Sequence, residues 1–240
     1  MRVEIGRLTP DRIDRETRMA ICDMWSGAES LTDGKKTDPK LMRTIYDNNS
    51  PDNLRREVSR QDSGIYVVQR LGRGGLLAAA IVTTKRGRAA PQYGDSHAGR
   101  PMYMEIFGAS VDAEEAWPGY LQSMVDQARK DFGRSMGSRV TKLCAYASPG
   151  ANERFPDAVR SINPRTYEKH GGEGGSFGVV SGVSGLYFRH DVEFEIPQTS
   201  YIRKALSNVT RPLLGVSSKS PLGELVPART GSTEEVPVAA

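Results

Sequence analysis

The strongest constraint on the fold is the passage from a strand pattern to a helix pattern between Met102 and Phe132. The run "MYMEIFGASV" is apolar enough for a strand, and apolar residues then recur at steps of three and four from Trp117 onward. Pro118 lacks an N–H and its ring collides with a preceding turn, so it fits as the first residue of a helix that ends near Gly133. The segment "SVDAEEAWPGYLQSM" therefore leads from a strand into a helix N-terminus.

One strand, two helical regions and a hairpin are predicted before this junction. "RVEIGRLTP" offers a strand followed by Thr9 and Pro10, an oxygen that caps a helix and a ring that suits its first turn. Pro39 and Pro51 each follow a capping residue and repeat this start signal. "GIYVVQR" and "LLAAAIVTT" are strand patterns joined by "LGRGG", which predicts an antiparallel hairpin.

After the long helix the chain returns to strands. "VTKLCAYAS" predicts a buried strand, "ANERFPDAVRSI" a short helix and "SFGVVSGVSGLYFRHDVEFEI" a final hairpin. Residues 197–240 are poor in aromatics and dotted with prolines, which predicts one short helix and then an unfolded tail. We therefore expect one folded domain over residues 1–196, of mixed α/β (α+β) class.

Composition excludes several classes of protein. Apolar residues make up 38% and charged residues 26%, as in an ordinary globular protein. No apolar run approaches the roughly 18 residues of a spanning helix, and the N-terminus has no signal-peptide core. We expect a cytoplasmic protein without a membrane partner. The net charge of +4 permits an anionic ligand but does not favour nucleic acid, because no long basic run with interleaved aromatics occurs.

The metal-ligating and nucleophilic residue types form no recognisable motif. Cys22 and Cys144 lie in segments that read as a helix and a buried strand, so we expect buried thiols rather than a disulfide. The histidines do not have the spacing of a zinc motif with these cysteines, and no metal is expected. The basic connection from Lys85 to Arg100 suits a solvated loop, an acidic acceptor or nucleic-acid phosphates.

Two short motifs resemble those of the GNAT family of acyl-CoA-dependent N-acyltransferases. "VDAEEAWPGYL", Val111 to Leu121, is similar to the family's "VDPEYRGKGIG", and "YEKHGG", Tyr167 to Gly172, is similar to its "YEKLGF". Together with the order of elements, the resemblance covers residues 1 to 193. It implies a mixed, mostly antiparallel central sheet flanked by helices.

The resemblance also implies a co-substrate, acetyl-CoA or another acyl-CoA, and the residues that would bind it. A helix start carries N–H groups and a partial positive charge, and it can hold the pyrophosphate of coenzyme A. The backbone donors implied for this role belong to Gly119, Tyr120 and Leu121. The strand edge implied for the pantetheine arm consists of Gly108, Ala109, Ser110 and Val111.

The reaction that the resemblance implies is direct attack of an amine on the thioester. The amine must be neutral, and the departing thiolate must receive a proton. Glu105 stands where the family often has a general base, and Tyr167 matches the tyrosine that protonates the thiolate in many members. From the residues alone, Glu105 is equally well an outward-facing carboxylate on a strand, and Tyr167 a packed aromatic.

The helix-start motif departs from the family pattern, so two functions remain open. The family's arginine is Ala116 here, its last glycine is Leu121, and Glu114 and Glu115 add negative charge. One hypothesis is an N-acyltransferase that acts on an amine-bearing small molecule or a protein acceptor. The other is a non-catalytic binding or structural protein whose cofactor groove is filled by Trp117 and its neighbours. The number of subunits is left open, a homodimer included.

Overall fold

The structure, a computed structural model, describes residues 2–29, 39–72, 75–93, 100–110, 116–135, 139–149 and 155–194. Their strands are β1 (Val3–Arg7), β2 (Ser63–Arg70), β3 (Leu76–Thr83), β4 (Pro101–Ala109), β5 (Lys142–Ala147), β6 (Glu168–His170), β7 (Ser176–Val180) and β8 (Val183–Glu193). Their helices are η1 (Pro10–Arg12), α1 (Arg15–Glu29), α2 (Pro39–Asn48), α3 (Pro51–Ser59), α4 (Trp117–Ser135) and α5 (Phe155–Ile162). The predicted tail, residues 197–240, lies outside the described residues.

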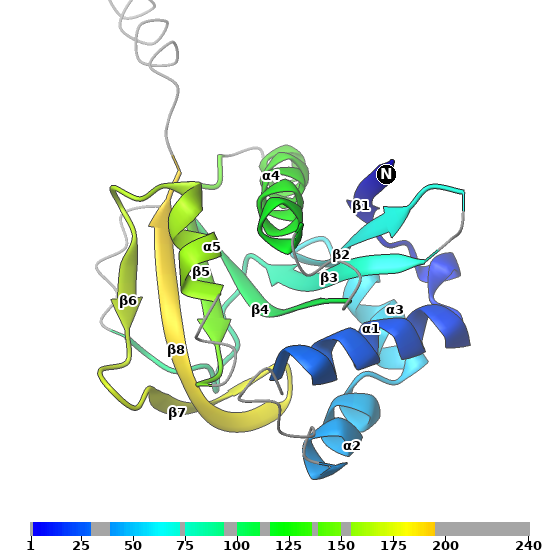
Figure 1. Cartoon of the computed structure of the whole chain (residues 1–240), viewed down its shortest axis with the longest axis horizontal. Helices are drawn as coiled ribbons and strands as arrows, with labels where there is room; N and C mark the ends of the chain where they lie inside the picture. The colour runs from blue at the N-terminus through cyan, green and yellow to red at the C-terminus, as the bar shows by residue number, and fades with distance from the viewer. Residues whose placement is uncertain are drawn as a thin grey trace, which may run out of the picture. The chain divides into compact units, whose positions relative to one another are not determined.

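The strands form one mixed sheet in the order β1-β2-β3-β4-β5-β8-β6, with β7 also paired to β8 (Figure 1). Neighbouring strands are antiparallel except β4 and β5, which are parallel and are connected through α4. A parallel pair needs such a crossover, whereas antiparallel strands can be joined by a tight turn. The predicted mixed, mostly antiparallel sheet flanked by helices is confirmed.

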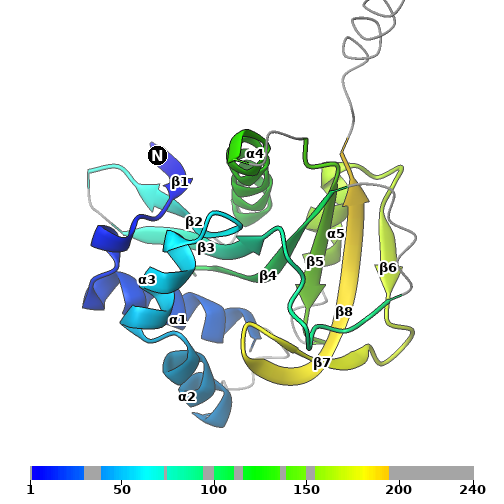
Figure 2. The same ribbon diagram turned by 180° about the vertical axis from the view of Figure 1, so that it is seen from behind.

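Helices cover the sheet on both sides (Figures 1 and 2). On what we call the α4 face, α4 and α5 bury an apolar cluster that includes Leu121, Phe132 and Val159. On the opposite side, the α1 face, α1 and α3 bury a second cluster around Trp25 and Leu54. Among the described helices, none combines the length and the apolar character that crossing a bilayer would require.

The start of α1 differs from the prediction. Thr9 and Pro10 open the short helix η1, and α1 begins at Arg15. Ile13 is buried between the two helices, and Asp14 caps α1 because its Oδ1 accepts a hydrogen bond of 2.7 Å from the Thr17 N–H. The sequence periodicity continues through Ile13 and therefore does not indicate the break between η1 and α1.

The other start signals fall where they were expected or one residue away. Ser50 caps α3 by accepting a hydrogen bond of 3.3 Å from the Asn53 N–H, and Pro51 is the first helical residue. Pro118 is the second residue of α4 rather than the first. Both positions lie in the first turn, where proline is tolerated.

The C-terminal strands are richer than the predicted hairpin. β7 and β8 form that hairpin, but Glu168–His170 within "YEKHGG" adds the short strand β6. The long strand β8 pairs with β5 along one edge, while β7 and β6 share its other edge.

Cys22 and Cys144 are buried free thiols, as predicted.

Candidate functional site

Glu105 is the extra residue of a β-bulge in β4. On β3, Val82 is opposite Met104 and Ile81 is opposite Ile106, so Glu105 is skipped in the register. Met104 packs in the core of the α4 face and Ile106 in that of the α1 face. Bulges re-aim side chains and are common beside active sites. The bulge therefore turns the Glu105 side chain, from the middle of a buried strand, toward the α1 face.

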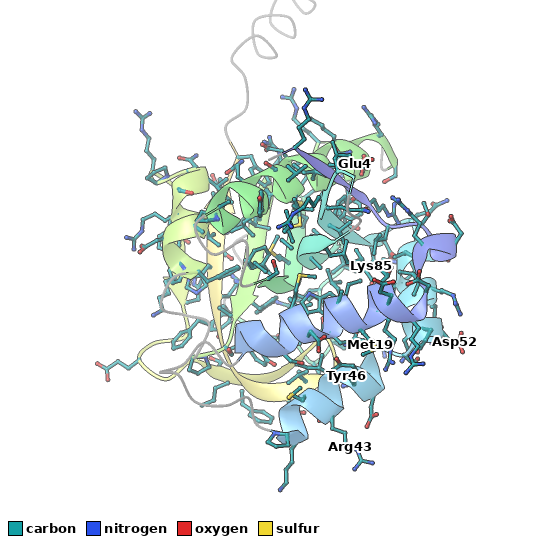
Figure 3. The ribbon with its side chains drawn as sticks, turned by 45° about the vertical axis from the view of Figure 1, so that its right-hand side comes forward. Glu4, Met19, Arg43, Tyr46, Asp52 and Lys85 are labelled. Atoms are coloured by element: carbon teal, nitrogen blue, oxygen red, sulfur yellow. The ribbon has the colours of Figure 1, made fainter. Side chains whose placement is uncertain are left out.

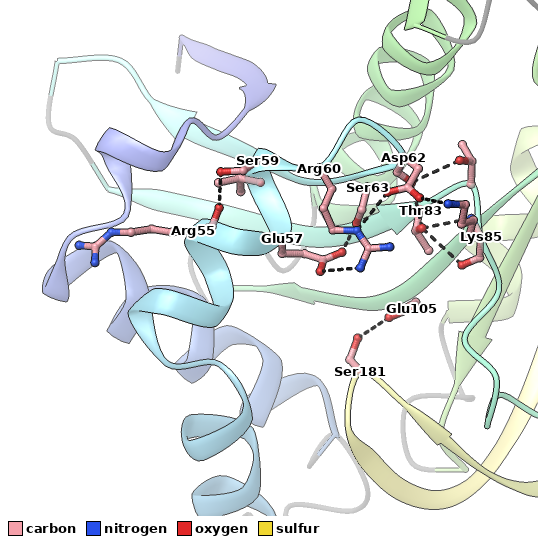
Figure 4. A network of polar contacts seen from close by, with 12 residues as sticks. Arg55, Glu57, Ser59, Arg60, Asp62, Ser63, Thr83, Lys85, Glu105 and Ser181 are labelled. Atoms are coloured by element: carbon pink, nitrogen blue, oxygen red, sulfur yellow. Dashed lines mark hydrogen bonds and ion pairs between the residues drawn. The ribbon is translucent and has the colours of Figure 1, made fainter.

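The Glu105 carboxylate lies on the α1 face among groups from the β7–β8 turn and the end of α3 (Figure 4). Ser181, in the turn between β7 and β8, donates a hydrogen bond of 3.0 Å from Oγ to Oε2. Burial raises the pKa of Glu105, and the charge of Glu57 raises it further, whereas the Ser181 hydrogen bond and Arg60 act in the opposite direction. A carboxyl group with a raised pKa is suited to general-base chemistry near neutral pH.

An ion-pair network holds Arg60 beside this carboxylate (Figure 4). Asp62 pairs with Arg60 Nε at 3.0 Å and with Lys85 Nζ at 2.7 Å, and hydrogen bonds from these two cations lower the pKa of Asp62 to about 2. Arg60 also pairs with Glu57 at 3.7 Å, and Glu57 accepts a hydrogen bond from the Ser63 hydroxyl. Lys85, from the basic connection, is therefore engaged with Asp62.

The β4–β5 ladder ends one residue before Glu105. The paired residues are Pro101–Met104 on β4 and Lys142–Ala145 on β5, yet β4 continues to Ala109. Figure 1 shows the two strands diverging beyond this point. The bulge therefore stands where the sheet divides.

The predicted pantetheine edge follows the bulge. Ser110 N–H donates a hydrogen bond of 2.9 Å to Leu77 O on β3. Because hydrogen-bonded pairs alternate in an antiparallel ladder, Gly108 also faces β3 with its backbone, while the N–H and C=O of Ala109 point toward β5. Of the described residues predicted to form the edge, Ala109 is directed suitably. Val111 lies outside the described residues.

Gly108 has a further role on the α1 face. A Cβ atom built on it would stand 2.5 Å from Met24 O and 2.9 Å from Trp25 N. The backbone of α1 therefore crosses β4 at contact distance over this glycine.

The N-terminus of α4 offers fewer donors than the sequence suggested. Tyr120 N–H donates to Ala116 O at 3.2 Å, which closes the first helical hydrogen bond. Leu121 is one residue deeper, and its side chain is fully buried in the core of the α4 face. Gly119 is exposed, and a Cβ there would meet no atom within 4 Å. The side chain of Trp117, predicted to discriminate between the two functions, lies outside the described part.

Tyr167 is not next to Glu105. Its ring packs against the core of the α4 face, stacks on His190 at an interplanar angle of 14°, and its hydroxyl lies 2.9 Å from His190 Nδ1. Arg160 of α5 lies 4.7 Å above the same ring. Tyr167 directly precedes β6, which β8 and β5 separate from β4, about 14 Å at the usual strand spacing.

A row of aromatic rings on the α4 face was not predicted. Phe107 of β4 and Phe155 of α5 have ring centroids 6.0 Å apart, and Phe155 lies at the same distance from His190. With the Tyr167 ring stacked on His190, the row extends from the diverging part of β4 to β6. Neighbouring rings in the row are 23 to 48 residues apart in the chain, so no local pattern marks them.

Glu168, His170 and Asp191 are the described residues whose ligand atoms gather as in a metal site, within 4.8 Å of one another. Asp191 is buried, but Lys142 Nζ lies 2.9 Å from its Oδ2 and Arg189 Nε lies 3.0 Å from its Oδ1. Two protein cations therefore already balance this carboxylate, and we assign no metal to the cluster.

No family model and no curated protein matches the sequence. Solved structures match the fold. PaiA N-acetyltransferase from Thermoplasma acidophilum in complex with coenzyme A is 10% identical with a TM-score of 0.53, and the match covers 81% of this chain and 100% of that chain. A probable acetyltransferase from Staphylococcus epidermidis is also 10% identical, with a TM-score of 0.50 and the same coverage. The chain has the GNAT acetyltransferase fold, in a divergent form.

Proposed function

We propose that this chain is an N-acyltransferase that moves an acyl group from acyl-CoA to an amine by direct attack. The observation that carries the proposal is the bulge that directs Glu105 to the α1 face at the point where β4 and β5 part. The fold relative from Thermoplasma acidophilum was solved with coenzyme A, which supports the same class of co-substrate here.

The arrangement suits the proton transfers of this reaction. An acceptor amine on the α1 face gives up a proton to Glu105, directly or through a water. The amine nitrogen then forms a bond to the thioester carbon, the C–S bond breaks, and the thiolate takes up a proton. A base with a raised pKa takes this proton more readily than an exposed carboxylate would. The role of Tyr167 as the donor to the thiolate stays a prediction.

The acyl-CoA would lie along the diverging part of β4. The backbone of Ala109 points toward β5 and suits the amides of the pantetheine arm. Gly119 is an exposed residue at the positive end of α4, and its backbone N–H is the donor proposed for the pyrophosphate. Acetyl-CoA is the proposed donor, and longer acyl chains belong to the same proposal.

The charge around Glu105 favours a basic acceptor. The charge of Glu57 acts on Glu105, and Arg60 is already paired with Asp62 and Glu57. Two carboxylates attract a protonated amine before one of them removes its proton. An amine-bearing small molecule and a protein amine both meet this requirement.

One observation favours the second candidate, a non-catalytic protein with this fold. The Phe107 and Phe155 rings are in contact beside the diverging part of β4, on the α4 face. If these rings occupy the space of the pantetheine arm, the protein does not bind acyl-CoA.

Calorimetric titration of the full chain with acetyl-CoA separates the two candidates. A ligand that binds the folded state raises its apparent stability, so we expect heat of binding and a higher melting temperature at millimolar acetyl-CoA. Glu105→Gln should bind acetyl-CoA equally well and fail to transfer the acetyl group to polyamine or peptide amines. Absence of binding by the wild-type chain would reject the enzyme and support the second candidate.

A further inference from the structure

We infer that Ser181 is a positioning residue for Glu105, holding one carboxylate oxygen from the β7–β8 turn so that the other faces the acceptor. The catalytic consequence rests on the proposed function, whereas the contact itself does not. Ser181 and Glu105 are 76 residues apart in the chain, and their side chains meet at 3.0 Å on the α1 face (Figure 4).

The backbone of Ser181 is unusual in a way that favours this role. Its φ angle is +46°, and among the described residues the other positive φ angles belong to glycines. Left-handed backbone is disfavoured for residues that carry a Cβ, and two-residue hairpin turns usually place Asn, Asp or Gly there. Strain of this kind persists where the surroundings enforce it, and it is concentrated at functional sites.

Contacts with α2 hold the β7–β8 turn in this conformation. Asn48, at the end of α2, donates a hydrogen bond of 2.8 Å from Nδ2 to Gly182 O, the next residue of the turn. A Cβ on Gly182 would stand 2.8 Å from the same nitrogen, so the turn and α2 are in close contact. α2 is in turn fastened to α1, because Arg18 donates to Tyr46 O at 2.7 Å and the Tyr46 hydroxyl donates to Asp23. Figure 3 shows Tyr46 beside α1.

The two oxygens of Glu105 have different environments. Oε2 accepts the hydrogen bond from Ser181. A Cβ on Gly87, in the connection after β3, would stand 3.7 Å from Oε1, and as a glycine this residue presents no side chain to that oxygen. The charged groups that face Glu105 are Glu57 and Arg60, both from the end of α3. The Ser181 hydroxyl therefore orients the carboxylate with Oε1 toward the proton that is removed.

A hydrogen bond to a carboxylate stabilises its charged form and opposes the effects of burial and of Glu57. Without the hydroxyl, Glu105 would hold its proton to a higher pH. A general base must be deprotonated to act, so the acidic limb of the pH profile of kcat/KM would move to higher pH.

The test compares Ser181→Ala, Ser181→Gly and the control Ser184→Ala, in the full chain. Ser181→Ala removes the hydroxyl and keeps the strained backbone, whereas Ser181→Gly removes both. Ser184 is an exposed serine of the same hairpin. The Glu105 carboxyl is titrated by 13C NMR, assigned with Glu105→Gln, and the pH profile of acetyl transfer is recorded beside it.

We expect the pKa of Glu105 to rise in both Ser181 variants and to stay unchanged in Ser184→Ala. At the acidic limb, kcat/KM should fall about tenfold, the effect of one lost hydrogen bond to a charged group. An unchanged Glu105 titration in Ser181→Gly would overturn the inference, because the hydroxyl would then have no influence on the carboxylate. A shifted titration in a chain without any acyl transfer would reject the proposed function and leave the positioning contact standing.

Discussion

Gly108 of β4 lies in contact with the peptide that joins Met24 to Trp25 in α1. A Cβ at Gly108 would stand 2.5 Å from Met24 O, closer than such contacts occur in proteins. Gly108→Ala should therefore force α1 away from the sheet and lower the free energy of unfolding by about 2 kcal/mol, as overpacking does. Urea denaturation followed by circular dichroism measures this loss.

The matched control for that substitution is Gly119→Ala. Gly119 has no neighbour within 4 Å of the position of a Cβ, and it lies in the first turn of α4. Alanine is favoured over glycine in a helix, so the free energy of unfolding should be unchanged or up to about 1 kcal/mol higher. Equal destabilisation by both substitutions would show that contact with α1 is not the cause.

Glu105→Gln tests the proposed base. We expect acetyl transfer to fall by about 100-fold or more, the usual contribution of a general base. The stability of the folded state should not decrease. Burial raises the pKa of Glu105, so the proton is bound more tightly in the folded state, and any stability from that proton is lost as pH rises. A neutral amide avoids this loss, and the melting temperature of the variant at pH 8 should equal or exceed that of the wild type.

Tyr167→Phe tests the predicted proton donor. The ring keeps its place under Arg160, while the hydrogen bond to His190 is lost, so we expect destabilisation of about 1 kcal/mol. If Tyr167 protonates the thiolate, kcat should fall by about 100-fold, and the loss should be smaller with acyl donors whose leaving group is more acidic. Full turnover by the variant would remove Tyr167 from the reaction.

His190 makes the stability of the protein depend on pH. Burial, followed by the nearby Lys169, lowers the pKa of His190 to about 4 from its usual 6.5. The folded state binds the proton less tightly than the unfolded state, so this stability is complete above pH 6.5 and is lost as pH falls toward 4. The loss is on the order of 3 kcal/mol.

Urea denaturation at pH 7 and at pH 4.5 measures that loss, with His190→Gln as the comparison. Carboxylates also titrate in this range, and their contribution is common to both proteins. A smaller pH dependence in His190→Gln is the expected result. The same dependence in both proteins would show that His190 is not the responsible group.

Much of the fold is readable from local patterns. Periodicity and proline signals predict α3 from Ser50 and Pro51, the β2–β3 hairpin, and the long helix after Pro118. They fail where tertiary packing decides. η1 interrupts the first helical region because Ile13 is buried there, and β6 is three residues long and exists through its pairing with β8.

The site was less predictable than the fold. The resemblance to the GNAT family points to Glu105, but "MEIF" contains no signal for a bulge, because the bulge is a property of the register with β3. Ser181 and Phe155 are brought to the site by packing between segments distant in the chain, which a single sequence does not reveal. Tyr120 was predicted as a donor to the ligand, but its N–H donates to Ala116 O. Whether this bond forms depends on the residue at which the helix begins, which the sequence does not fix.

The bulge also has a consequence for inheritance. Met104 and Ile106 already belong to opposite faces of the sheet. In a chain that lacked residue 105, the side chains of β4 would therefore alternate between the two faces without a break in the register with β3. A single in-frame deletion would thus erase the carboxylate and leave a more regular strand. Descendants that keep the fold and lack the proposed base should therefore arise in one mutational step.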